Sequence, residues 1–188
     1  MYAIIWRKKK YKRWYPSAYE HSVFTIDYQK LYQKGYRGII FDIDNTLVHH
    51  GDDSTAEVDR LFEYIHGLGI KTLLLSNNSE ARIQKFNENI HTLYISNADK
   101  PATTNYFKAI SMLELEKAQV VCVGDQLFTD IYGANQSGID SILVDFIRLP
   151  EEKKIGKKRI LEKWILWFYM HDHLCKNKIG DIHKEEII

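Results

Sequence analysis

Two carboxylates one residue apart follow an apolar run in the first quarter of the chain. The run Gly38–Phe41 leads directly into Asp42 and Asp44, the pattern expected when a buried parallel strand delivers side chains to its carboxyl end. Carboxylates placed there can attack phosphorus or hold a divalent cation, and phosphoryl transfer needs both functions. Short acidic turns also cap helices, so the pair alone is a moderately specific signal.

Three further polar segments follow apolar runs or begin helices. They contain Ser76 and Asn77, then Lys100 before a proline, then Asp125 and Asp130 in a Gly-Asp-x-x-x-x-Asp sequence. Open parallel sheets bind ligands outside the carboxyl ends of their strands. We therefore expect these side chains to gather at one edge of a sheet.

In these four segments the chain resembles the haloacid dehalogenase (HAD) superfamily of aspartate-nucleophile phosphatases. The family motifs are Asp-x-Asp-x-Thr, a Ser or Thr after the second core strand, a Lys, and Gly-Asp-x-x-x-x-Asp, and all four occur here in that order. The sequences at 44–48, 76–78 and 100–101 are most similar to the YqeG-type branch and its mitochondrial phosphatidylglycerophosphatase relatives. The resemblance extends over roughly residues 16–170.

The resemblance implies a role for each catalytic residue. Asp42 would be the nucleophile that forms an aspartyl-phosphate, and Asp44 would protonate the leaving group and then deprotonate the attacking water. Lys100 would neutralise both Asp42 and the transferring group. Ser76, Asn77 and Lys100 would bind the phosphoryl oxygens, with backbone N–H groups at a helix start assisting.

A magnesium site is implied by the same motifs. Mg²⁺ prefers oxygen ligands and keeps several waters, which fits the Asp42 carboxylate, the Asp44 backbone carbonyl and Asp125. Asp130 would bind the ion or one of its waters. The alternative for Asp125 and Asp130 is a turn followed by a helix N-cap.

Alternating apolar runs and helical patterns predict a three-layer α/β/α, Rossmann-like domain with a five-stranded parallel sheet. The strands are expected near 38–43, 71–75, 92–96, 119–123 and 140–145, and the helices near 54–67, 79–89, 102–115 and 129–137. One helix and one strand fill each interval between the first three motifs, so no cap domain fits. An uncapped site should be open and rely on a large substrate or a partner surface to exclude water.

Two flanking segments, 1–36 and 151–188, enclose the predicted phosphatase domain at 37–150. The first is a basic, aromatic arm with a lead-in helix, suited to an anionic membrane surface and almost equally to nucleic acid. The last is a basic, then apolar helix with a tail, which would pack on the domain, form a homo-oligomer contact or lie on a membrane. The sequence leaves these choices open.

Composition is that of an ordinary globular protein, with a net charge of only +1. No apolar stretch approaches the ~20 residues of a membrane span, and Cys122 and Cys175 show no disulfide spacing. We expect a cytoplasmic protein, in peripheral contact with the inner face of the membrane if its substrate is a lipid.

The sequence thus predicts a Mg²⁺-dependent phosphomonoester hydrolase. The resemblance to the YqeG branch implies a phospholipid phosphate such as phosphatidylglycerophosphate as substrate. The alternatives are a phosphatase of a soluble nucleotide, nucleic-acid or protein phosphate, and a non-catalytic module that binds phosphate.

Overall fold

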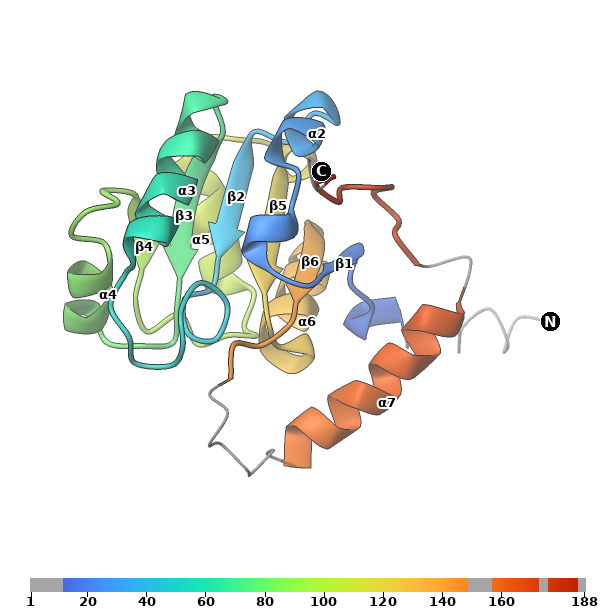
Figure 1. Ribbon diagram of the computed structural model, residues 1–188. Helices are drawn as coiled ribbons and strands as arrows, with labels where there is room; N and C mark the ends of the chain where they lie inside the picture. Colours follow the sequence, from blue (N-terminus) through green and yellow to red (C-terminus); the bar gives the residue numbers. More distant parts are fainter. Residues whose placement is uncertain (1–11, 149–156, 173–175, 186–188) are drawn as a thin grey trace.

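A parallel six-stranded sheet forms the centre of the computed structural model, which describes residues 12–148, 157–172 and 176–185 (Figure 1). The strand order is β1-β6-β5-β2-β3-β4, and every neighbouring pair is parallel. The strands are β1 (Ala18–Glu20), β2 (Gly38–Phe41), β3 (Lys71–Leu75), β4 (Leu93–Ile95), β5 (Val120–Gly124) and β6 (Asp140–Val144). The central strands β2 and β5 are buried along their whole length.

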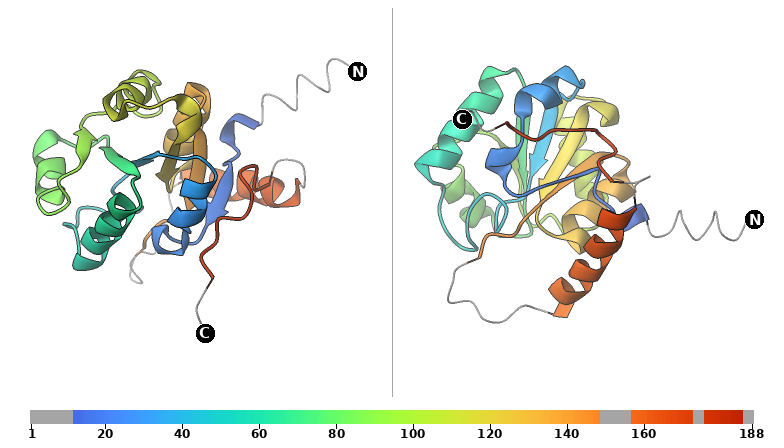
Figure 2. Two further views of the ribbon diagram at one scale, coloured as in Figure 1. Left: turned by 90° about the horizontal axis from the view of Figure 1, so that it is seen from above. Right: turned by 45° about the vertical axis from the view of Figure 1, so that its right-hand side comes forward.

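Helices cover both faces of this sheet, as the two further views show (Figure 2). One face packs against α2 (Tyr28–Gln33), α3 (Ala56–Gly67) and α4 (Glu80–Phe86), and the other against α5 (Thr104–Leu113) and α6 (Tyr132–Ser137). Side chains of a strand alternate between faces. Ile39 and Phe41 accordingly join the first core, while Ile40 joins the second.

The predicted three-layer domain without a cap is confirmed for the described residues, with one strand added. Strand β1 was not predicted, because three residues in a segment interpreted as an arm give too short a pattern. It pairs with β6, Ala18 opposite Ile142, and Ser17 Oγ donates to Asp140 Oδ1 at 2.7 Å. The division of the chain at 37 and 151 stays a prediction.

The predicted helix at 129–137 is interrupted. It begins as a π-helical turn, η4 (Leu127–Ile131), and continues as α6. Single π-turns inside helices are frequent at functional sites, and this turn carries Asp130.

The C-terminal helix α7 (Lys157–His171) lies beside the β6–β1 edge of the sheet (Figure 1). Its Ile165 and Leu166 pack on a small core formed by Leu127, Ile131 and Leu143. The other side of α7 is exposed and strongly apolar, with Ile160, Leu161, Trp164, Trp167, Phe168 and Met170 each at least 40% exposed. Within the described residues, no helix has the length and apolarity needed to span a bilayer.

The predicted basic arm falls largely on residues 1–11, which lie outside the described residues, as does Cys175. Where the description begins, Lys12–Trp14 forms a short 3-10 turn. The Trp14 ring stacks on Tyr132 of α6 at 5.9 Å between centroids. The end of the arm is therefore fixed to the domain.

Candidate active site

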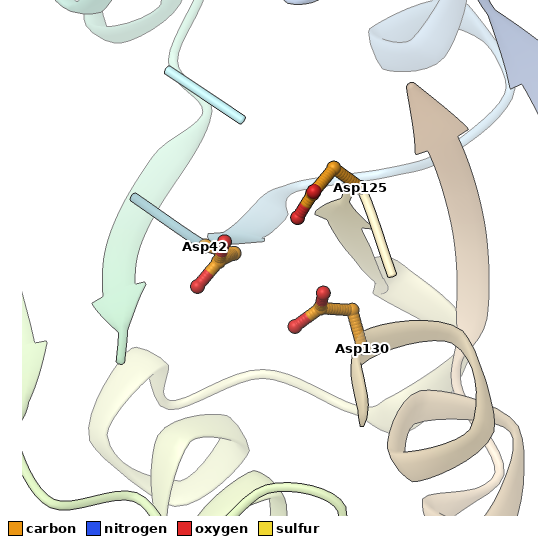
Figure 3. A group of neighbouring side chains, drawn as sticks. All are labelled: Asp42, Asp125 and Asp130. Atoms are coloured by element: carbon orange, nitrogen blue, oxygen red, sulfur yellow. The ribbon is translucent and has the colours of Figure 1, made fainter. Parts of the chain in front are cut away.

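Three buried carboxylates meet at the carboxyl ends of two adjacent strands. Asp42 follows β2 and Asp125 follows β5, and these strands lie in register with Phe41 opposite Val123. Asp130 enters from η4, so that ligand oxygens of all three aspartates lie within 4.8 Å of one another. Figure 3 shows the three carboxylates turned toward a common space.

Lys100 lies between two of these carboxylates. Its Nζ is 2.5 Å from Asp42 Oδ1 and 2.7 Å from Asp130 Oδ1, and its side chain is buried. Burial alone would lower the pKa of Lys100, but the charges of Asp130 and Asp42 outweigh it and raise the pKa above its ordinary value. Lys100 therefore carries a permanent positive charge into the site.

Two of the three carboxylates lie in surroundings that disfavour their ionised form. Burial is the main cause that raises the pKa of Asp42 to about 6, against the opposing effect of Lys100. Burial, followed by repulsion from Asp42 and Asp130, raises the pKa of Asp125 to about 7. The Thr46 hydroxyl lies 3.1 Å from Asp42 Oδ2 and 3.3 Å from Asp125 Oδ1. This is an environment in which a bound cation would stabilise both ionised carboxylates.

Gly124 allows Asp130 to approach strand β5. A Cβ at residue 124 would lie 2.5 Å from both Cβ and Cγ of Asp130, closer than packed atoms tolerate. Asp130 Oδ2 also accepts a hydrogen bond of 3.2 Å from the backbone N–H of Gln126. The glycine of the Gly-Asp motif is therefore required by packing.

Asp44 lies outside the three-carboxylate cluster. Its Oδ1 accepts from the backbone N–H of Gly51 at 2.9 Å and from Arg82 Nη2 at 3.4 Å, and its Oδ2 accepts from Asn78 Nδ2. These contacts fix the carboxylate beside the loop that follows the first motif. Its roles in proton transfer and, through the backbone carbonyl, in metal binding stay predictions.

Ser76 and Asn77 follow β3 and reach the site differently. Ser76 Oγ accepts from the backbone N–H of Asn78 at 3.2 Å, which closes the turn before α4. Asn77 Oδ1 accepts from the backbone N–H of Lys100 at 2.8 Å, and Asn77 Nδ2 donates to the Lys100 carbonyl at 3.4 Å. Asn77 thus supports the Lys100 loop, and phosphate binding by either residue stays a prediction.

Sequence reasoning missed several residues that contact the site. Asn78 and Arg82 hold Asp44, as described above. Arg159 of α7 forms an ion pair with Asp125 through Nη2, and its Nη1 donates to the Asp125 carbonyl at 2.6 Å. Asn78 stands within a motif and was accessible to inference. Arg159 stands in the basic run 157–159, which in sequence resembles a solvated surface.

Comparison with known proteins places this chain next to a bacterial phosphatase. A family model described as HAD-hydrolase-like matches residues 97–146, which include Lys100, Asp125 and Asp130. The protein named probable phosphatase YqeG from Bacillus subtilis (strain 168) is 37% identical over 130 residues. That match covers 69% of this chain and 76% of the relative.

Solved structures share the fold at low sequence identity. An uncharacterized protein from Listeria monocytogenes serotype 4b superposes with a TM-score of 0.50 at 19% identity, covering 71% of this chain and 98% of its own. A hypothetical protein from Xanthomonas campestris superposes with a TM-score of 0.50 at 14% identity, covering 78% and 88% of the two chains. These likenesses concern the fold alone.

Proposed function

Because this chain belongs to the YqeG-type phosphatases of the HAD superfamily, we propose that it hydrolyses phosphate monoesters through an aspartyl-phosphate on Asp42. One observation carries the proposal. Asp42 is a buried carboxylate at a strand end, paired with Lys100 and adjacent to two further carboxylates. A nucleophile, a fixed cation and oxygen ligands for a second cation are thereby available at one point.

The cluster fits Mg²⁺ in the chemistry of its ligands. All three side chains offer carboxylate oxygens, the ligands that Mg²⁺ prefers, within 4.8 Å of one another. Asp42 and Asp125 would hold the ion together with the backbone carbonyl of Asp44, and Asp130 would bind it or one of its waters. When bound, Mg²⁺ would neutralise charge on the phosphoryl oxygens and on Asp42.

In the first step a carboxylate oxygen of Asp42 attacks phosphorus, and the bond from phosphorus to the ester oxygen breaks. Lys100 stabilises the charge on the phosphoryl group from its position beside Asp42. Asp44 gives its proton to the departing alkoxide, so the alcohol leaves neutral. Ser76 and Asn77 orient the phosphoryl oxygens.

In the second step water attacks phosphorus of the aspartyl-phosphate. Asp44, now ionised, takes the proton of that water, and the bond from phosphorus to Asp42 breaks. Inorganic phosphate leaves and both carboxylates return to their starting states. Asn78 and Arg82 hold Asp44 in place between the two proton transfers.

A phosphoenzyme measurement tests this function. We expect wild-type protein, incubated with a radiolabelled aryl phosphate and Mg²⁺ and then quenched in acid, to carry an acid-stable, base-labile label. Asp42→Asn should carry none, whereas Asp44→Asn should accumulate label because its second step is slowed. Glu63→Gln, the same carboxylate-to-amide change at an exposed position of α3, is the control. Label that persists in Asp42→Asn would refute the assignment of the nucleophile.

We propose further that the physiological substrate is a phospholipid phosphate such as phosphatidylglycerophosphate, reached by peripheral contact with an anionic bilayer. The support comes from α7, whose exposed face combines aromatic side chains with a lysine. Trp164 is 62% and Trp167 52% exposed, and exposed Lys163 is adjacent to Trp164 in the helix. Amphipathic aromatics and cations suit the interface of an anionic membrane. Arg159, on the packed side of α7, contacts Asp125, so the helix begins beside the active site.

Substrate preference can be measured with a panel of phosphate donors. The panel contains a nucleotide, a phosphopeptide, an aryl phosphate and phosphatidylglycerophosphate in vesicles with varied anionic lipid. Trp164→Ala/Trp167→Ala should keep aryl phosphate turnover and lose most vesicle turnover, whereas Tyr64→Ala, an exposed aromatic of α3, should change neither. Turnover of the nucleotide or phosphopeptide above that of the lipid would favour the soluble-substrate alternative.

A further inference from the structure

Helix α7 contributes a charged side chain to the carboxylate cluster. The Asp125 side chain is completely buried and Arg159 is 19% exposed. The guanidinium binds Asp125 twice, through Nη2 to the carboxylate Oδ2 and through Nη1 to the backbone carbonyl at 2.6 Å. Two contacts from the planar guanidinium fix the position of Arg159 and hold its positive charge next to Asp125.

The two oxygens of the Asp125 carboxylate have different partners. Arg159 binds Oδ2, while Oδ1 lies 3.3 Å from the Thr46 hydroxyl, which is itself 3.1 Å from Asp42 Oδ2. The oxygen bound by Arg159 is thus not the one that Thr46 links to Asp42. Arg159 approaches the carboxylate on the Oδ2 side and leaves Oδ1 toward the cluster.

Arg159 is itself held firmly. Its Nη1 donates to Glu162 Oε2 at 3.0 Å, and its guanidinium lies 4.7 Å from the centre of the Phe146 ring. Glu162 is buried and its Oε1 accepts from the backbone N–H of Leu127 at 3.0 Å. Leu127 begins η4, the turn that carries Asp130. One pair of α7 side chains therefore connects to both segments that supply Asp125 and Asp130.

From this geometry we infer that Arg159 is a positioning residue, which holds Asp125 so that Oδ1 would be the oxygen offered to a divalent cation in the cluster. Helix α7 thereby sets the metal affinity of the site. The inference rests on the proposed function, because it concerns the metal of that reaction. It differs from a blocking role, in which the guanidinium would occupy the place of the cation and its removal would tighten metal binding.

Metal affinity of the full-length protein tests the inference without measuring turnover. Mg²⁺ binding by calorimetry and Mn²⁺ binding by electron paramagnetic resonance are compared for wild type, Arg159→Gln, Arg159→Lys and Lys158→Gln. Loss of a partner that orients a ligating carboxylate typically weakens metal binding about 10–100-fold, and we expect this for Arg159→Gln. Arg159→Lys keeps the charge without the planar fork and should fall between Arg159→Gln and wild type.

Lys158→Gln is the matched control, since it removes one positive charge from the neighbouring exposed position. Its affinity should stay within about twofold of wild type because water and salt screen it. Glu162→Gln keeps the shape of the side chain and weakens the hold on Arg159, so it should lose affinity to a smaller extent. This variant serves if Arg159→Gln fails to give a folded protein by circular dichroism.

The possible results separate the inference from the proposed function. Unchanged or tighter metal binding in folded Arg159→Gln, or unchanged binding in Glu162→Gln when Arg159→Gln does not fold, would overturn the positioning role alone. Absence of Mg²⁺ and Mn²⁺ binding by wild type would overturn the proposed function, and this inference with it. Weaker binding in Arg159→Gln with an unaffected Lys158→Gln supports the inference.

Discussion

Replacement of Asp125 by Asn should make the metal-free protein progressively more stable, relative to wild type, as pH rises. Burial and neighbouring carboxylates raise the pKa of Asp125 from its ordinary 3.8 to about 7 in the folded protein. Between those two values the folded state holds a proton that the unfolded state has lost. Wild type therefore loses stability as pH rises through this window. The Asp125→Asn protein keeps its stability, because an amide does not titrate.

The magnitude follows from the shift. The pKa of Asp125 is roughly 3 pH units higher in the folded than in the unfolded state, and each unit corresponds to about 1.36 kcal/mol. Between pH 4 and pH 8 the free energy of unfolding of Asp125→Asn should therefore rise by about 4 kcal/mol relative to wild type. The attraction between Arg159 and ionised Asp125 lowers the pKa of Asp125 and is already included in the value of about 7. Effects of the substitution that do not depend on protonation add only a constant offset. The quantity to measure is therefore how the difference in unfolding free energy between Asp125→Asn and wild type changes with pH.

Urea unfolding in the presence of EDTA, at several pH values across this range, measures both proteins. Added Mg²⁺ at pH 8 should stabilise wild type more than Asp125→Asn, because a ligand stabilises the state that binds it. A difference that stays flat with pH, or that turns in favour of wild type as pH rises, would refute the electrostatic account of the cluster.

Three further predictions address other parts of the site. Gly124→Ala should lower Mg²⁺-dependent turnover at least about tenfold and lower the free energy of unfolding by about 1–3 kcal/mol, since the new Cβ displaces Asp130. Gly67→Ala is the control, because a Cβ there meets nothing within 4 Å, and equal losses in both variants would contradict the packing argument. Lys100→Met should destabilise the protein by about 3–5 kcal/mol in urea titrations, because Asp42 and Asp130 lose their buried partner. A variant as stable as wild type would show that the two ion pairs of Lys100 give no net stabilisation. The acid limb of the pH profile of kcat/KM should move to lower pH as the Mg²⁺ concentration is raised, because the pKa of Asp42, about 6 without the ion, falls beside a cation. An acid limb that stays at the same pH at every Mg²⁺ concentration would show that another group titrates there.

The sheet and the three aspartates were predictable because the signals are local. An apolar run followed at once by an acid identifies Asp42 and Asp125, and parallel strands bring such positions together at one edge. Asp130 follows from the motif spacing, although the π-helical turn that presents it does not. The parallel domain is confirmed. It was predictable because each central strand is buried on both faces, so its sequence is continuously apolar.

What escaped prediction depends on contacts between distant parts of the chain. Strand β1 is only three residues long and finds its partner β6 more than a hundred positions later. Arg159 is 34 positions from Asp125, and its charge is indistinguishable in sequence from that of its lysine neighbours. Arg82 binds Asp44 through side-chain geometry that no periodicity encodes. The apolar and basic pattern of α7 also left its packing open, and the helix in fact packs on one side and exposes the other.

The edge strand β1 has a consequence for the order of events during synthesis. It is translated before the other described strands, yet its hydrogen-bonding partner β6 lies near residue 140. A segment just after β1 pairs later still, since the backbone N–H of Asp27 bonds to the carbonyl of Ile182 at 2.7 Å. Contacts of such long sequence separation form late and slowly. Until then β1 and the β6 edge are unpaired templates for other chains. Nascent protein should accordingly depend on chaperones that shield this edge, and variants that weaken β1 pairing should aggregate during expression before they lose activity.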